Sequence, residues 1–167
     1  MTSAPEPHLR PGVRALILDE SDRVLLCRWD FPTEAVWGTP GGGIEAGETH
    51  LAALRRELLE EVGLQLDPPE TLPPHLWHQR VLAQGHATGY DGVVNDIYLV
   101  RTRAFEPAGS LSTAELAAEN LMALRWWTLH ELSSYAGPDL FAPRDIAGLV
   151  ATVLRQGAPA EPLVVGL

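Results

Sequence analysis

The chain has 167 residues and a mass of 18.2 kDa, which is room for one compact domain. Hydrophobic residues make up 46% of it and charged residues 20%, a composition too apolar for general disorder. Twenty-two acids oppose twelve bases, all of them arginine, so the formal net charge is -10. This acid excess argues against a nucleic-acid duplex or an anionic membrane as the main partner, because both require clustered positive charge.

The sequence also predicts a cytoplasmic protein. Its apolar runs are far shorter than the roughly 20 residues of a membrane-spanning helix. The Pro- and Ala-rich beginning lacks the basic and apolar regions of a secretory signal. The single cysteine, Cys27, cannot form an internal disulfide, which fits a reducing compartment, and its place in a predicted strand indicates a buried small apolar residue.

We expect a flexible lead-in over residues 1–12, one domain over residues 13–157, and a tail over residues 158–167. Within the domain, residues 13–18 and 23–28 read as two strands of a hairpin, because both runs are apolar and a polar turn separates them. Residues 29–43 are predicted to form a long loop, since they end in a run of Gly and Pro that regular elements disfavour.

An amphipathic helix is predicted next. Thr49 or Glu48 can serve its N-terminal end, and Gly63 is well placed to end it. Four leucines at spacings of three and four are expected to dock this helix on the sheet: Leu51, Leu54, Leu58 and Leu59.

The remaining elements are predicted from apolar runs and the Gly or Pro residues between them. In chain order they are a return into the sheet at 64–66, strands at 76–83 and 93–103 joined by a loop at 84–92, a loop at 105–112, a short turn or helix at 113–120, a strand from 124, a helix at 143–156, and an extended or mobile tail.

Three glutamates gather on one side of the predicted helix, near the face opposite its leucines. Glu57, Glu60 and Glu61 lie at i, i+3 and i+4, and each like-charged pair costs roughly 0.2–0.5 kcal/mol on an open helix surface. A hard divalent cation removes that cost, because Mg²⁺ prefers carboxylate oxygens together with water and substrate phosphates. The glycines before the helix leave backbone groups open to a phosphate or metal.

The segment from Gly42 to Leu64 resembles the Nudix box, G-x5-E-x7-R-E-U-x-E-E-x-G-U, in which U is a bulky aliphatic residue. Every specified position is matched: Gly42, Glu48, Arg56, Glu57, Leu58, Glu60, Glu61, Gly63 and Leu64. Nine positions at fixed spacing make a specific motif, although the box covers only 23 residues.

This resemblance implies an α/β fold, the Nudix α/β/α sandwich with a mixed β-sheet between helices. It implies hydrolysis of a phosphoanhydride bond by water attack on phosphorus, assisted by one to three Mg²⁺ or Mn²⁺ ions. The substrate is a nucleoside di- or triphosphate, or a nucleoside diphosphate linked to another moiety. Similar proteins are commonly dimers, so a homodimer through the C-terminal segment is one candidate assembly.

The resemblance also implies a role for each residue of this sequence that stands at a functional position of the box. Glu57, Glu60 and Glu61 match the metal-ligand glutamates, and Arg56 matches the arginine that orients one of them. The box also implies a backbone carbonyl near Gly41 or Gly42 as a further metal ligand and substrate contact. Glu48 and Gly63 match structural positions of the box, and Glu48 sometimes makes an outer metal contact.

An acid outside the box often completes such sites, a few residues before a late-strand tryptophan. Glu119 precedes Trp126 by seven residues and is our candidate for an extra ligand or the general base. Glu115 is its competitor, and the general base is alternatively Glu57 or Glu60.

Other side chains near the motif have simpler interpretations. Trp29, Phe31 and Trp37 border the glycine loop, and packing is the commoner role of such aromatics, although Trp37 is retained as a substrate-stacking candidate. His75 and His78 lie three apart on a predicted strand, so we expect opposite faces and no shared metal. Trp126 and Trp127 are expected to place one ring in the core and one near the surface.

The absence of subfamily signatures narrows the range of substrate classes. The chain lacks the signatures of ADP-ribose, diadenosine polyphosphate, coenzyme A and NADH hydrolases, so the default is a MutT-like nucleotide pyrophosphohydrolase. One alternative is a non-catalytic nucleotide sensor, which the intact glutamates disfavour. Another is an isopentenyl-diphosphate isomerase-like enzyme, which would require a suitably placed cysteine and extra metal-binding histidines.

Overall fold

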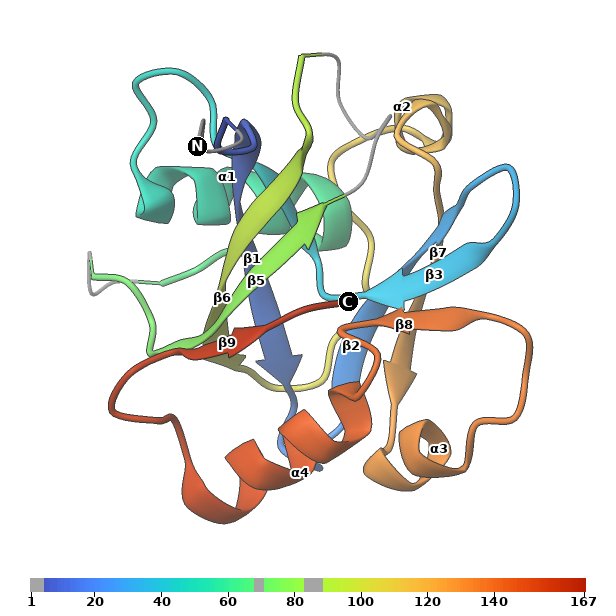
Figure 1. Cartoon of the computed structure of the whole chain (residues 1–167). Helices are drawn as coiled ribbons and strands as arrows, with labels where there is room; N and C mark the ends of the chain where they lie inside the picture. Colours follow the sequence, from blue (N-terminus) through green and yellow to red (C-terminus); the bar gives the residue numbers. More distant parts are fainter. Residues whose placement is uncertain (1–4, 68–70, 83–88) are drawn as a thin grey trace.

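A mixed β-sheet forms the centre of the protein, and helices cover both of its faces (Figure 1). The structure, a computed structural model, describes residues 5–67, 71–82 and 89–167. Within these ranges the strands are β1 (Leu9–Leu18), β2 (Val24–Asp30), β3 (Ala35–Gly38), β4 (Gly41–Gly43), β5 (His75–Leu82), β6 (Gly92–Arg101), β7 (Leu121–Trp127), β8 (Leu140–Ala142) and β9 (Leu163–Val165). The helices there are α1 (His50–Val62), α2 (Thr113–Ala118), α3 (Leu129–Ser134) and α4 (Ile146–Gln156).

The sheet has the order β8-β3-β2-β1-β6-β5-β9, with β4 paired to β1 and β7 paired to β2. The central β1 and β6 are parallel over ten residue pairs, from Leu9↔Gly92 to Leu18↔Arg101. Most other neighbours are antiparallel, so the sheet is mixed. This arrangement confirms the expected α/β/α class, and β1 begins at Leu9, four residues before the predicted strand.

Alternation along β1 divides the core into two layers, because successive side chains of a strand point to opposite faces. Val13 and Ile17 pack with Leu54 and Leu58 of α1. Leu16 packs on the other face in the cluster that holds α4. The site-bearing helix α1 and the C-terminal helix α4 therefore cover opposite faces of the sheet.

Helix α1 begins and ends as its sequence predicts. The Thr49 side chain caps it and accepts the Ala52 N–H at 3.2 Å, and Gly63 ends it with φ of 75°. Leu54 and Leu58 are fully buried, but Leu59 is 46% exposed, so its expected docking on the sheet was wrong. Leu59 follows Leu58 by one residue, a turn of about 100° that carries it off the packed face.

Two predicted elements differ from the structure. Residues 29–43 are not one loop, because they contain β3 and β4, and β4 consists of glycines alone. Residues 64–66 form no strand, and Leu64 and Leu66 instead pack against the core beside α1. Neither α3 nor β8 was anticipated, since each is only a few residues long.

The later strands agree with their patterns. β5 and β6 pair antiparallel with Leu82 opposite Gly92, as expected of a hairpin, although residues 83–88 of the connection lie outside the described ranges. Trp127 is in the core at 2% exposure, whereas Trp126 packs on the other face against Phe105, as predicted. The tail contributes β9, which pairs parallel to β5.

The left-handed end of α1 yields a stability prediction. A Cβ on Gly63 would lie 2.2 Å from the Ala108 carbonyl oxygen, whereas a Cβ on Gly47, also at positive φ, would meet nothing within 4 Å. Gly47→Ala is expected to lower the free energy of unfolding by about 1–2 kcal/mol, the cost of a left-handed L-residue. Gly63→Ala should lower it further because of the collision. Urea denaturation measures both, and equal losses would contradict the role given to Ala108.

Candidate active site

The site is built where α1 crosses the glycine strand β4. A Cβ on Gly42 would lie 2.6 Å from the Glu57 carboxylate, and one on Gly41 would lie 2.2 Å from the Val13 carbonyl oxygen. Gly41 also has a φ of 140°, which L-residues with side chains rarely adopt. Glycines are therefore required here for two reasons: the Glu57 carboxylate approaches Gly42 closely, and the β1 backbone approaches Gly41.

Glu61 is the most deeply buried acid of the box, at 3% exposure. Its Oε2 accepts the backbone N–H of Gly41 at 2.9 Å. Burial raises the pKa of Glu61 to about 8, an effect that the Arg14 charge and the Gly41 hydrogen bond oppose. Charges on Glu57 and Glu119 add to the increase. The folded protein therefore keeps a proton on this carboxyl to a higher pH than an exposed glutamate would.

Glu57 is also buried, at 8% exposure, and this burial raises its pKa although Arg56 acts in the opposite direction. Glu60 is more accessible, with 32% of its side chain exposed. The expectation that the three acids lie opposite the leucine face was therefore wrong for Glu57 and Glu61. They lie at the edge of the packed face of α1, where the side chains of β4 are only hydrogens.

Arg56 forms hydrogen bonds with three of the acids of the site. Its Nε and Nη2 donate to the two oxygens of Glu48 at 2.8 and 3.0 Å, a bidentate pair. Its Nη1 donates to Glu57 at 2.8 Å and to Glu60 at 3.3 Å, while Nη2 also reaches the Gly43 carbonyl at 3.0 Å. The Arg56 hydrogen bonds lower the pKa of Glu48 to about 2, so Glu48 is a permanent anion that fixes the guanidinium.

The structure distinguishes the two acids proposed outside the box. Glu115 closes a capping box with Ser112, and this hydrogen bonding lowers its pKa. Glu119 ends the same helix, and its charge acts on Glu61. Asn120, which follows it, has a φ of 61° and turns the chain into β7. Of the two, Glu119 is therefore the acid electrostatically coupled to the box.

Trp37 makes the contacts of a packing residue. It is 7% exposed, its ring meets Trp127 edge-on at 5.1 Å, and its Nε1 donates to Asp139 at 2.9 Å. Trp29 is half-buried, and the Arg14 guanidinium lies over its ring, 5.2 Å from the centroid. Cys27 is fully buried in β2, and burial raises the pKa of its thiol well above the usual value.

Sequence reasoning missed Arg14. Its Nη1 donates to the Thr39 carbonyl at 2.8 Å, and its charge lowers the pKa values of Glu57 and Glu61. The signal was a cation within the otherwise apolar run of residues 13–18, a position that is unfavourable unless a buried acid lies nearby. Arg14 is therefore a second positive charge near the acids of the site, although its hydrogen bond goes to the Thr39 carbonyl.

The donor set fits a hard divalent cation. Two buried carboxylates, a third more exposed one and the open backbone of β4 supply the oxygen ligands that Mg²⁺ and Mn²⁺ take in proteins. Among residues 5–67, 71–82 and 89–167, no three His, Cys, Asp or Glu side chains already stand in a coordinating arrangement. Here the oxygens of Glu57 and Glu61 instead accept hydrogen bonds from Arg56 and Gly41.

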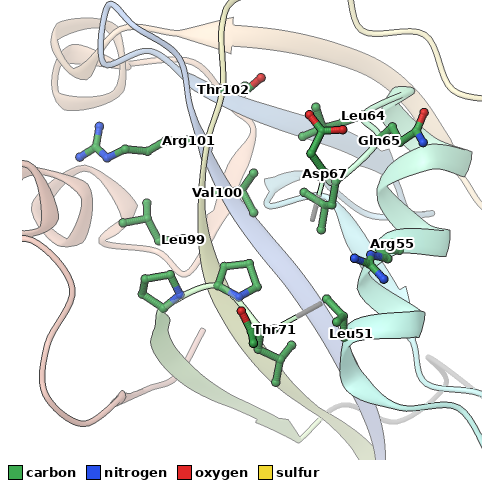
Figure 2. A pocket seen from close by; sticks show the side chains of 14 residues that line it. Leu51, Arg55, Leu64, Gln65, Asp67, Thr71, Leu99, Val100, Arg101 and Thr102 are labelled. Carbon is green, nitrogen blue, oxygen red and sulfur yellow. The ribbon is translucent and has the colours of Figure 1, made fainter. Parts of the chain in front are cut away.

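A pocket of about 450 Å³ lies elsewhere along α1, with Leu51 and Arg55 on one side and residues 99–102 of the β6 end on the other (Figure 2). None of the box glutamates lines it. The carboxylate cluster and this pocket are therefore separate features of the structure.

Comparison with known proteins agrees with this geometry. The NUDIX domain family matches residues 8–146. The chain resembles an RNA pyrophosphohydrolase of Halorhodospira halophila, with 49% identity over 55 residues (33% of this chain, 29% of that protein). It also resembles one of Rickettsia conorii, with 32% identity over 95 residues (47% of this chain, 59% of that protein). The chain thus spans between about a third and three fifths of the length of these relatives.

Solved structures share the fold. A MutT NUDIX hydrolase from Burkholderia pseudomallei superposes with a TM-score of 0.57 at 27% identity, covering 83% of this chain and 94% of that one. An ADP-ribose pyrophosphatase from Streptococcus suis has a TM-score of 0.56 at 17% identity, covering 93% and 98%. Because the Streptococcus suis protein is only 17% identical to this chain, its similarity shows a shared fold and nothing more.

The raised pKa of Glu61 predicts how pH affects the metal-free protein. Because the folded pKa of about 8 exceeds the ordinary value of 4.5, the folded state holds the proton more tightly, and stability falls as pH rises between these values. With EDTA present, thermal unfolding of Glu61→Gln should lose part of this decline, while the exposed-site control Glu34→Gln should keep it. Equal pH profiles for the two variants would contradict the burial effect.

Proposed function

The chain belongs to the NUDIX family, and from that premise we propose that it is a metal-dependent pyrophosphohydrolase of a nucleoside di- or triphosphate, or of a nucleoside diphosphate linked to another moiety. The observation that carries this proposal is the burial of Glu57 and Glu61 against the bare backbone of β4. Two buried acids this close to one another are costly without a cation, and a substrate phosphate supplies the remaining ligands that such a cation requires.

We assign Glu57, Glu60 and Glu61 to hold Mg²⁺ or Mn²⁺, with Glu119 and the backbone near Gly41 as additional contacts. The bound ion would neutralise charge developing on the phosphate and lower the pKa of water. Arg56, fixed by Glu48, orients Glu57 and Glu60 through their oxygens. The water is deprotonated by a carboxylate that remains free of the ion; Glu119, Glu57 and Glu60 are the candidates.

A MutT-like nucleotide is the first substrate class, and the pyrophosphate at an RNA 5′ end is the second. The second class follows from the names of the Halorhodospira and Rickettsia relatives. The net charge of -10 favours the first, because a longer RNA would need extended positive surface for its phosphates. The fully buried Cys27 does not favour isomerase chemistry, which would need an accessible thiol.

A cytoplasmic location is part of the proposal, since the one cysteine is a buried free thiol. Among the described residues, no helix is long and apolar enough to cross a membrane. The homodimer expected from similar proteins stays a prediction.

Activity is the first test. With Mg²⁺, a panel of nucleoside triphosphates, nucleotide sugars, dinucleotides and 5′-triphosphorylated oligoribonucleotides should include one that releases phosphate or pyrophosphate. Glu60→Gln should lower kcat by at least about 100-fold, as loss of a charge-stabilising group does. The capping acid Glu115 supplies the matched control, because Glu115→Gln should leave kcat within a few-fold. Tight binding of a nucleotide without turnover of any panel member would instead favour the sensor.

Metal dependence of binding is the second test. The site acids repel a phosphate, so calorimetry with EDTA should detect little binding of a non-hydrolysable nucleotide analogue, and excess Mg²⁺ should restore it. Glu57→Gln should weaken the restored binding. Equal affinity with and without the ion would overturn the assignment of these acids as metal ligands.

A further inference from the structure

Trp29 is a half-buried indole near the end of β2, and its packed part contacts the core cluster that holds Cys27. The pairing of β2 with β7 is irregular between Arg28 and Trp29. Irregular pairings re-aim side chains and are frequent next to active sites. Trp29 therefore has one part of its ring packed in the core and another part open to a ligand.

Arg14 links this indole to the acids of the site. Its guanidinium lies over the Trp29 ring, 5.2 Å from the centroid, which is within the range of a cation–π contact. The same positive charge opposes the increase in the pKa values of Glu57 and Glu61 that burial causes. One cation is therefore close to both the aromatic ring and the carboxylates.

Two further relationships place Trp29 beside the acids. Burial raises the pKa of the Cys27 thiol, and the charge of Glu61 adds to the increase, so Glu61 lies near β2 two residues before Trp29. On the β7 edge, Trp29 pairs with Leu121, which follows Glu119 by two residues. Glu119 in turn acts on Glu61. The open part of the indole is thus next to the place where substrate phosphates would be held.

Gly38 leaves room for the ring. A Cβ on Gly38 would lie 3.1 Å from Cζ3 of Trp29 and 3.4 Å from the Ala142 carbonyl oxygen, so a side chain there would press on the indole. Gly38 on one side and the Arg14 guanidinium on the other fix the orientation of the ring before a ligand arrives. A ring held in this way loses little freedom on binding, which favours affinity.

Two other tryptophans of the sheet are less suited to contact a substrate. Trp37 is only 7% exposed and packs edge-on against Trp127. Trp126 is half-buried but pairs with Leu25, four residues before Trp29 on β2, or about 13 Å away at 3.3 Å per residue. Of these three tryptophans, Trp29 alone combines open ring surface with a place beside the acids.

We propose that Trp29 is the platform on which the nucleobase of the substrate stacks, the role that the sequence suggested for Trp37. This inference rests on the proposed function and narrows its substrate class to phosphoanhydrides that carry a base, as opposed to base-free diphosphates or polyphosphates. Stacking on an aromatic side chain tolerates every base, because every base has a π-face. The acids and their ion hold the phosphates, and Trp29 holds the other end of the molecule.

Calorimetry in excess Mg²⁺ tests the platform with two non-hydrolysable probes: methylene-bridged adenosine diphosphate, and methylenediphosphonate, which lacks the nucleoside. Wild type should bind the nucleotide probe at least about tenfold more tightly than the base-free one. Trp29→Leu should remove most of that difference and leave the affinity for methylenediphosphonate unchanged. Trp29→Phe keeps an aromatic face and should retain the preference.

Trp126→Leu is the matched control. Trp126 is also half-buried and also lies under a guanidinium, that of Arg23 at 5.6 Å from the ring centroid. The two leucine variants therefore remove similar packing and a similar cation–π contact. Trp126→Leu should bind both probes as wild type does, which separates loss of the platform from a general loss of packing.

Kinetics separates this inference from the hydrolase assignment. With a substrate identified in the nucleotide panel, Trp29→Leu should raise KM at least about tenfold and keep kcat within a few-fold, because stacking holds substrate and transition state alike. Normal turnover with an unchanged KM would overturn the platform and leave the hydrolase standing. Base-dependent binding without turnover of any panel member would support the platform and contradict the hydrolase. Equal affinity of the wild-type protein for the two probes would overturn the platform without the use of any variant.

Discussion

The guanidinium of Arg56 is the interaction on which the site depends. It contacts Glu48, Glu57 and Glu60 together with the Gly43 carbonyl, so one cation links the loop before α1, the helix itself and the glycine strand. Without it, acids at i, i+3 and i+4 would repel one another beside a buried sheet. Because its fork is planar and pre-organised, it fixes directions as well as charge, which a lysine would not do.

The glycine strand β4 is the second constraint on the position of the site acids. Gly42 faces the Glu57 carboxylate, and Gly41 donates its N–H to Glu61. A side chain on Gly42 would displace the Glu57 carboxylate, and one on Gly41 would collide with the backbone of β1 at Val13 and Arg14. The site is thus a place where helix carboxylates approach a backbone without intervening side chains. Burial raises the pKa of Glu61, and the positive charge of Arg14 on β1 opposes this increase.

Many of the excess acidic side chains have partners in the folded structure. Some acids are paired, such as Asp139, which accepts from Arg28 and Trp37, and Asp19, which binds Arg23. Others face positive or titratable groups of the protein itself: Arg56 and Arg14 act on Glu57, and Asp96 lies beside His75 and His78.

The sequence by itself determined the local features: the bounds of α1 from Thr49 and Gly63, the apolar strands, and the residues of the box, because these depend on spacing within one segment. Tertiary structure decided what depends on contacts between distant segments. Glycines 41–43 became a strand because β1 offers partners for their backbone groups. The charges of Arg14 on β1 and of Glu119 at the end of α2 act on Glu61. An irregular pairing of β5 with β6 brings His75 and His78 to the same carboxylate, Asp96, so the prediction that they point to opposite faces was wrong. Such contacts join segments that lie far apart along the chain, and the spacing of residues within one segment does not show where a partner strand introduces a bulge.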